Sequence, residues 1–212
     1  MGFPCIADTL PAPFLVGWAT VATMNSASPS IVSGRSCSGC TLCCKLLGIR
    51  ELEKPRLTWC PNCTIGVGCK IYGKHPAECR SFYCSFLLTP SLGEHWKPVA
   101  SKMVVSYEEE GDWIVVHVDP GRPLAWRVEP YYSEIKNWAT AAAKQLGKVI
   151  VWQGANAIAV FPDKEIELGP VGQDQVIVYV ERRGALGPAM EAHVVDSNHP
   201  WAARFARKPP LA

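Results

Sequence analysis

The chain has 212 residues, of which 48% are hydrophobic and 19% charged, and this composition favours a folded chain over a disordered one. Lys and Arg number 21 and Asp and Glu 19, so the net charge is only +2, which predicts no nucleic-acid partner. The sequence contains no run of about 18 apolar residues, so no membrane span is expected.

The N-terminal residues 1–33 carry no pattern of a folded element, and we expect a disordered tail. The apolar stretch from Leu10 to Met24 is interrupted by two prolines and lacks the basic start of a secretory signal. Met24 is an alternative start, in which case residues 1–23 are not translated. Export is therefore the less favoured interpretation, and the expected location is the cytoplasm.

Cysteine is the informative residue type in this chain. Of ten cysteines, nine lie between Cys37 and Cys84, and the tenth is Cys5. A secreted disulfide protein usually distributes its cysteines through a small chain, so this clustering favours a metal centre in a reducing compartment. Because glycine and proline interrupt the stretch repeatedly, residues 34–100 are predicted to be a loop-rich module that depends on bound metal for its fold.

The spacing of the cysteines leaves the metal open. Cys37, Cys40 and Cys43 are each separated by two residues, which suits three corners of a [4Fe–4S] cluster. Zinc more often takes two separate pairs, and structural zinc is the main alternative, followed by disulfides or metal-free thiol chemistry. Further candidate ligands follow along the chain, with His75 as a minor candidate: Cys44, Cys60, Cys63, Cys69, Cys79 and Cys84.

The segments CSGCTLCC and WCPNCTIGVGCKIYGKHPAECRSFYC resemble the YkgJ-like CxxCxxCC cysteine-cluster family, which is described as zinc- or iron-chelating. The match covers roughly residues 37–88. The resemblance implies eight metal ligands, namely Cys37, Cys40, Cys43, Cys44, Cys60, Cys69, Cys79 and Cys84. Cys63 is additional to the family pattern and is either a further ligand or a spare thiol.

The same resemblance implies that Tyr72 and Arg80 lie beside the centre, where Arg80 would offset the thiolate charge. One branch of the family, the flagellin lysine N-methylases, carries the motif with an iron–sulfur centre in an enzyme that acts on protein lysines. The present chain is much shorter than expected for that branch, so methylase activity rests on analogy alone.

The second half of the chain has the periodicity of regular structure. MVVSY and WIVVHV predict a hairpin, residues 130–147 predict one helix, and KVIVW, NAIAVF and QVIVYVE predict three further strands. Residues 101–195 are therefore expected to form an α+β module in the order β-β-α-β-β-β, with a small, mostly antiparallel sheet and one packed helix. Residues 196–212 are expected to be a loose basic tail.

Together these patterns predict a metal-binding protein whose cysteine cluster chelates iron, as [4Fe–4S], or zinc. The α+β module would offer a surface for a protein partner or a substrate. Two alternatives remain open: a protein-modifying enzyme that uses the cluster, and a metal chaperone or storage protein. The number of cysteine ligands tests the enzyme alternative, since catalysis needs a cluster that is held by three cysteines and has one open iron. A chaperone or storage protein would instead bind more than one exchangeable metal equivalent per chain.

Overall fold

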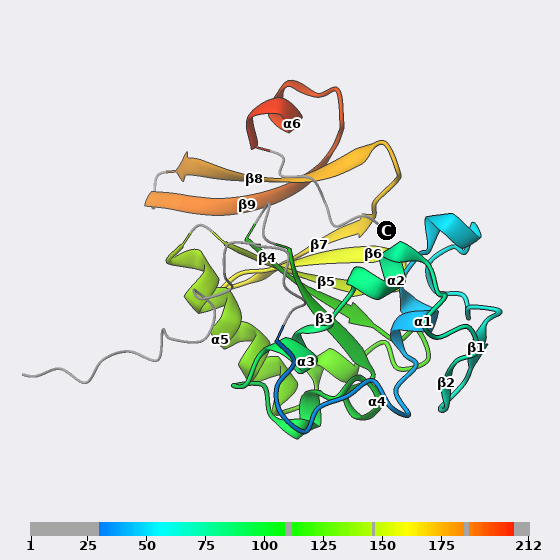
Figure 1. Cartoon of the computed structure of the whole chain (residues 1–212). Helices are drawn as coiled ribbons and strands as arrows, with labels where there is room; N and C mark the ends of the chain where they lie inside the picture. Colours follow the sequence, from blue (N-terminus) through cyan, green and yellow to red (C-terminus); the bar gives the residue numbers. More distant parts are fainter. Residues whose placement is uncertain (1–29, 109–111, 146, 185–186, 206–212) are drawn as a thin grey trace, which may run out of the picture.

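The computed structural model describes residues 30–108, 112–145, 147–184 and 187–205. The expectations for Cys5 and for the tail up to residue 29 lie outside these ranges. A five-stranded sheet forms the centre, with helix α5 (Tyr131–Ala143) on one face and the hairpin β8–β9 on the other (Figure 1). The chain is α+β, as predicted.

The central sheet has the strand order β3-β4-β5-β6-β7. Strands β3 (Met103–Glu108) and β4 (Trp113–Val118) form the predicted hairpin, and α5 then connects β4 to its parallel neighbour β5 (Lys148–Gln153). Strands β6 (Asn156–Val160) and β7 (Glu165–Pro170) continue the sheet in antiparallel fashion. The sheet is therefore mostly antiparallel, as expected.

Both faces of the sheet are buried, because different elements cover them. Ile114 and Val116 belong to a core with Ile135 of α5, whereas Trp113 belongs to a second core with Ile177 of the hairpin. Alternate residues of a strand point to opposite faces, so a strand covered on both sides has no polar face. This explains why the sequence of β4 is an almost uninterrupted apolar run.

The end of the chain differs from the prediction in three respects. The last strand of the central sheet is β7, which the sequence analysis missed. The predicted final strand, QVIVYVE, belongs instead to β8 (Gln175–Gly184), which pairs with β9 (Gly187–Asp196) in a separate two-stranded sheet. Helix α6 (Pro200–Phe205) follows in the segment that was expected to be loose.

The cysteine-rich segment consists of short elements joined by turns, as its composition predicts. They are α1 (Cys43–Leu46), η1 (Arg50–Leu52), β1 (Cys63–Thr64), β2 (Gly68–Cys69), α2 (Ala77–Ser81), α3 (Ser85–Leu88), η2 (Glu94–Trp96) and α4 (Pro98–Ser101). One more short turn, η4 (Ala125–Arg127), precedes α5. No helix in the described part of the chain has the length and hydropathy to cross a membrane.

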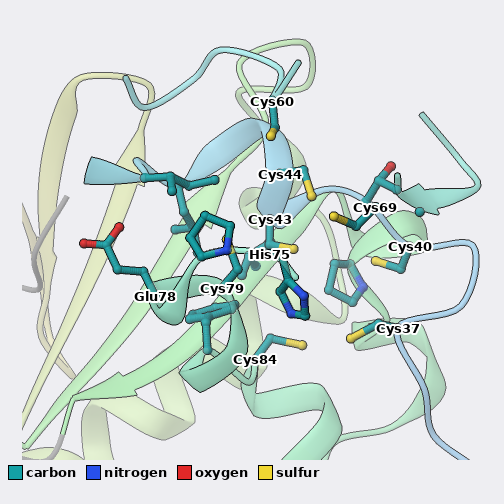
Figure 2. A pocket seen from close by; sticks show the side chains of 18 of the residues that line it. Cys37, Cys40, Cys43, Cys44, Cys60, Cys69, His75, Glu78, Cys79 and Cys84 are labelled. Carbon is teal, nitrogen blue, oxygen red and sulfur yellow. The ribbon is translucent and has the colours of Figure 1, made fainter. Parts of the chain in front are cut away.

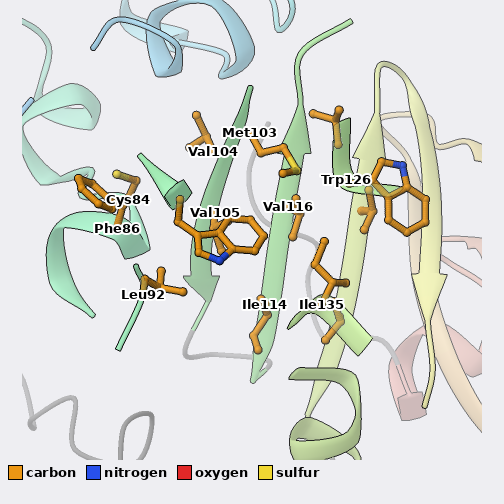
Figure 3. Close-up of a cluster of buried hydrophobic side chains, with 14 of the residues drawn as sticks. Cys84, Phe86, Leu92, Met103, Val104, Val105, Ile114, Val116, Trp126 and Ile135 are labelled. Atoms are coloured by element: carbon orange, nitrogen blue, oxygen red, sulfur yellow. The ribbon is translucent and has the colours of Figure 1, made fainter. Parts of the chain in front are cut away.

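The cysteine-rich segment shares its core with the sheet. Phe86 and Leu92 pack in the same buried cluster as Val105 and Ile114 (Figure 3). At the start of the described chain, the Arg35 guanidinium donates hydrogen bonds to the carbonyls of three residues that follow the last cysteine, namely Phe86, Thr89 and Leu92. The segment is therefore held against the sheet by apolar packing as well as by its own turns.

Candidate metal centre

The first cysteine motif forms a turn that runs into a short helix. The Cys40 amide donates to the Cys37 carbonyl at 3.0 Å, and Cys43 and Cys44 lie in α1. Gly39 has a φ of +69°, which is accessible to glycine at little cost. The C-x2-C turn thus brings the first two thiols together before the helix presents the next two.

The second motif repeats this turn and is tied to the first. The Cys63 amide donates to the Cys60 carbonyl at 3.0 Å, and the Cys60 amide donates to the Cys44 carbonyl at 3.0 Å. The hairpin of β1 and β2 then places Cys69 directly opposite Cys63. Backbone hydrogen bonds therefore bring together cysteines that are up to 25 positions apart, Cys44 and Cys69 among them.

Eight cysteines line one cavity of about 920 Å³. Figure 2 shows their side chains gathered around it from several segments of the chain. Cys79 comes from α2, and Cys84 immediately precedes α3. The eight are the full set implied by the family resemblance: Cys37, Cys40, Cys43, Cys44, Cys60, Cys69, Cys79 and Cys84.

The other candidate residues lie at the margin of this cavity. Cys63 is not among the lining residues, but its thiol shares a hydrogen bond with Cys44. His75 lines the cavity, and its Nδ1 accepts a hydrogen bond from the Gly73 amide at 3.0 Å. The ring of Tyr72 stacks on His75 with centroids 4.9 Å apart, and Tyr72 is 79% exposed. Tyr72 and His75 therefore line the cavity together with the cysteines, and Cys63 does not.

The cysteines differ in acidity. Hydrogen bonding by the Cys43 thiol is the main reason that the pKa of Cys44 falls to about 6, with Cys63 and the charge of Lys54 acting in the same direction against burial. Burial is the first cause that raises the pKa of Cys79 and Cys84 to about 11. Cys44 therefore favours the thiolate at neutral pH, and a metal bound by Cys79 and Cys84 would have to displace their protons.

Lys54 is a cation beside the cysteines that the sequence analysis missed. It is only 6% exposed, and its ammonium donates to the backbone carbonyls of Lys45, Leu47 and Pro55. Desolvation lowers the pKa of Lys54, while attraction to the thiolates of Cys60, Cys44, Cys43 and Cys79 opposes that shift. No sequence signal distinguished this lysine from a surface residue.

Arg80 is the cation that the sequence analysis expected to offset the thiolate charge. Its side chain is exposed and donates to the carbonyl of His75 at 3.3 Å. Burial strengthens electrostatic interactions, because the surrounding dielectric is lower than that of water. Lys54 is therefore the better placed of these two cations to act on the thiolates.

The thiols of the described cysteines form the donor set of this cavity. The nine described cysteines form no disulfide, and eight of them line the cavity. Thiolates are ligands of both zinc and iron–sulfur clusters, so these side chains are of the type that could hold either group. Among the described residues, no group of three or more His, Cys, Asp or Glu side chains has the geometry of a single metal-ion site.

Comparison with known proteins identifies no relative: the chain matches no family model, no curated protein and no solved structure.

Proposed function

We propose that this protein binds a metal centre through the eight cysteines that line the cavity, and that the centre is an iron–sulfur cluster of the [4Fe–4S] type. The observation that carries the proposal is the convergence on one cavity of thiols from several separate segments. Thiolates are the ligands that iron–sulfur clusters and zinc share. Eight are twice the number that one four-coordinate centre requires.

The spacing and number of the thiols favour a cluster over structural zinc. Cys37, Cys40 and Cys43 are each separated by two residues, which suits three corners of a [4Fe–4S] cluster, whereas zinc more often takes two separate pairs. Eight thiols line the cavity of about 920 Å³, twice the four ligands that one zinc ion takes. Zinc remains the alternative occupant, and it would require the side chains to close on the ion.

The thiols beyond the four that one centre requires are relevant to the function of the protein. Eight cysteines allow a second four-coordinate centre, which also suits a metal chaperone or storage protein. The size of the cavity leaves room beside one cluster for a substrate, which suits a protein-modifying enzyme. We place the protein in the cytoplasm, because reduced thiols persist there.

The decisive experiment is anaerobic purification followed by elemental analysis and visible absorption spectroscopy. About four Fe per chain with a broad band near roughly 400 nm is expected for one [4Fe–4S] cluster. About eight Fe would indicate two clusters, whereas a colourless protein with about one or two Zn would leave a structural zinc module. A preparation with neither metal would refute the proposal.

A matched pair of cysteine substitutions tests which thiols bind the metal. Cys63→Ser is the control, because Cys63 does not line the cavity although it neighbours Cys44. Cys79→Ser removes a thiol that does line the cavity. We expect Cys79→Ser to lose metal and Cys63→Ser to retain it. Equal retention by both variants would contradict the assignment of Cys79 as a ligand.

A further inference from the structure

Two arginines of this chain stack on buried tryptophans, and they differ in one respect. The guanidinium carbon of Arg127 lies 4.1 Å from the Trp126 ring centroid, and that of Arg56 lies 4.5 Å from the Trp152 ring centroid. Arg127 also pairs with the carboxylate of Glu165 at 2.8 Å. In the described part of the chain Arg56 has no such carboxylate.

Arg56 is therefore a partly buried charge without a counter-charge. Its Nε atom is buried and has no hydrogen-bond partner among the described residues. Burial lowers the pKa of Arg56, which reflects the cost of removing the guanidinium from water. An uncompensated cation of this kind gains most from an anion, because hydrogen bonds to a charged group are about twice as strong as neutral ones.

The contact between Arg56 and His117 determines the hydrogen-bonding role of the imidazole. The Arg56 Nη2 atom lies 3.4 Å from His117 Nδ1. Arginine can only donate, so Nδ1 is the acceptor, and the proton of the neutral ring resides on Nε2. Burial, followed by the charge of Arg56, lowers the pKa of His117 to about 3, so the ring is neutral at physiological pH. His117 thus holds one N–H group available as a donor.

Ser106 adds a second donor to the same face of the sheet. The register pairs Val104 with His117 and Ser106 with Val115, so Ser106 and His117 are diagonal neighbours on adjacent strands. Ser106 is 4% exposed, and its hydroxyl has no partner among the described residues. Ser106 and His117 both line the cavity that contains the cysteines.

We propose that the wall formed by Ser106 and His117, with Arg56 behind His117, is a binding site for a small organic anion that carries a carboxylate or a phosphate group. The hydroxyl of Ser106 and the Nε2–H of His117 would donate to the anion, and Arg56 would supply the positive charge.

The size of the cavity is consistent with such a ligand. Small-molecule sites commonly enclose roughly 300–1,000 Å³, and the present cavity of about 920 Å³ is lined by thiols on one side and by strands β3 and β4 on the other. A molecule bound by Ser106 and His117 would share the cavity with the metal centre. The inference rests on these two residues and Arg56, and it does not require the thiols to bind metal.

The test is a titration of the full chain, as purified with its metal, with sodium acetate and with inorganic phosphate at constant ionic strength. The indole N–H signal of Trp152, assigned with Trp152→Phe, reports binding because Arg56 stacks on this ring. A saturable shift is expected with at least one anion. Tighter binding of acetate would assign a carboxylate ligand, and tighter binding of phosphate would assign a phosphate ligand.

Three variants make the test specific. Arg56→Gln is expected to weaken binding at least about tenfold, because it removes the positive charge behind His117, and Ser106→Ala about three- to tenfold, because it removes a donor to a charged ligand. Arg127→Gln is the matched control, because it changes the other arginine on a tryptophan, and it should bind as the wild type does. If Arg56→Gln does not fold, the small change in Ser106→Ala still tests the site.

No saturable shift with either anion, or equal binding by wild type and Ser106→Ala, would overturn the inference. An equal loss in Arg127→Gln would also overturn it, since the effect would then be one of general charge. Metal content is measured on every sample. Anion binding with no metal would refute the proposed function alone, and full metal with no anion binding would refute this inference alone.

Discussion

The burial of His117 makes the stability of this protein depend on pH in a way that one substitution should remove. An unfolded histidine has a pKa near 6.5, whereas burial and the neighbouring Arg56 lower that of folded His117 to about 3. Below pH 6.5 the unfolded chain therefore binds a proton that the folded chain does not. Stability is complete above pH 6.5 and falls as the pH decreases from there towards 3.

The magnitude follows from the two pKa values. Each pH unit between them is equivalent to about 1.4 kcal/mol, so lowering the pH from 7 to 5 should cost about 2 kcal/mol from this residue alone. A domain is typically stable by about 5–15 kcal/mol, so a change of this size is measurable by urea unfolding. His117→Asn keeps an acceptor near Arg56 and removes the titration.

The assay compares the free energy of unfolding of wild type and His117→Asn at pH 7, 6 and 5. Cys44, with its pKa of about 6, titrates in the same range, but it does so in both proteins and cancels in the difference. The two curves should converge at low pH by about 2 kcal/mol relative to their separation at pH 7. Parallel curves would show that folded His117 titrates with the same pKa as in the unfolded chain, and would refute the reasoning.

Three further substitutions should change stability, as measured by urea unfolding. Lys54→Met should cost about 2–4 kcal/mol, because its carbonyl partners lose a buried donor; an unchanged midpoint would contradict this. Gly39→Ala should lower the free energy of unfolding by about 1 kcal/mol and reduce the metal content, because the φ of Gly39 is +69°. Gly172→Ala is the control and should leave both quantities unchanged, because Gly172 does not have a positive φ of this kind. Ile135→Ala should cost about 2–5 kcal/mol, and exposed Val128→Ala less than about 0.5 kcal/mol.

The fold was predictable where local pattern and tertiary environment agree. Strands β3 to β6 and helix α5 have strong periodicity, and each was found close to its predicted position. Strand β7 has the sequence EIELGP, in which charged residues alternate with apolar ones at an exposed edge of the sheet. Strand β9 begins with Gly187 and Pro188, which disfavour strands, and it owes its structure to pairing with β8. Pairing of this kind is not encoded locally.

The residues of the candidate site were likewise predictable only in part. The cysteines were located by their spacing, because a metal centre draws its ligands from short, repeated intervals along the chain. Lys54, Arg56 and His117 were not found: the two basic residues lie in a loop-rich segment where charged residues are ordinarily exposed, and His117 is a single polar residue in an otherwise apolar strand. Their role depends on burial, which only the packing of the cysteine-rich segment against β3 and β4 produces.

The position of Lys54 favours the thiolate form of the neighbouring cysteines. Burial, followed by repulsion from other thiolates, raises the pKa of Cys79 and Cys84 and keeps these two thiols protonated. A cation in water would do little to relieve this, because solvent and salt screen it. The hydrogen bond from the Cys43 thiol is the main cause that lowers the pKa of Cys44, and the buried ammonium of Lys54 adds to it through a lower dielectric. In the proposed metal centre Cys44 would therefore be the first thiol ready to bind, and the positive charge of the metal would lower the pKa of the next thiols in turn.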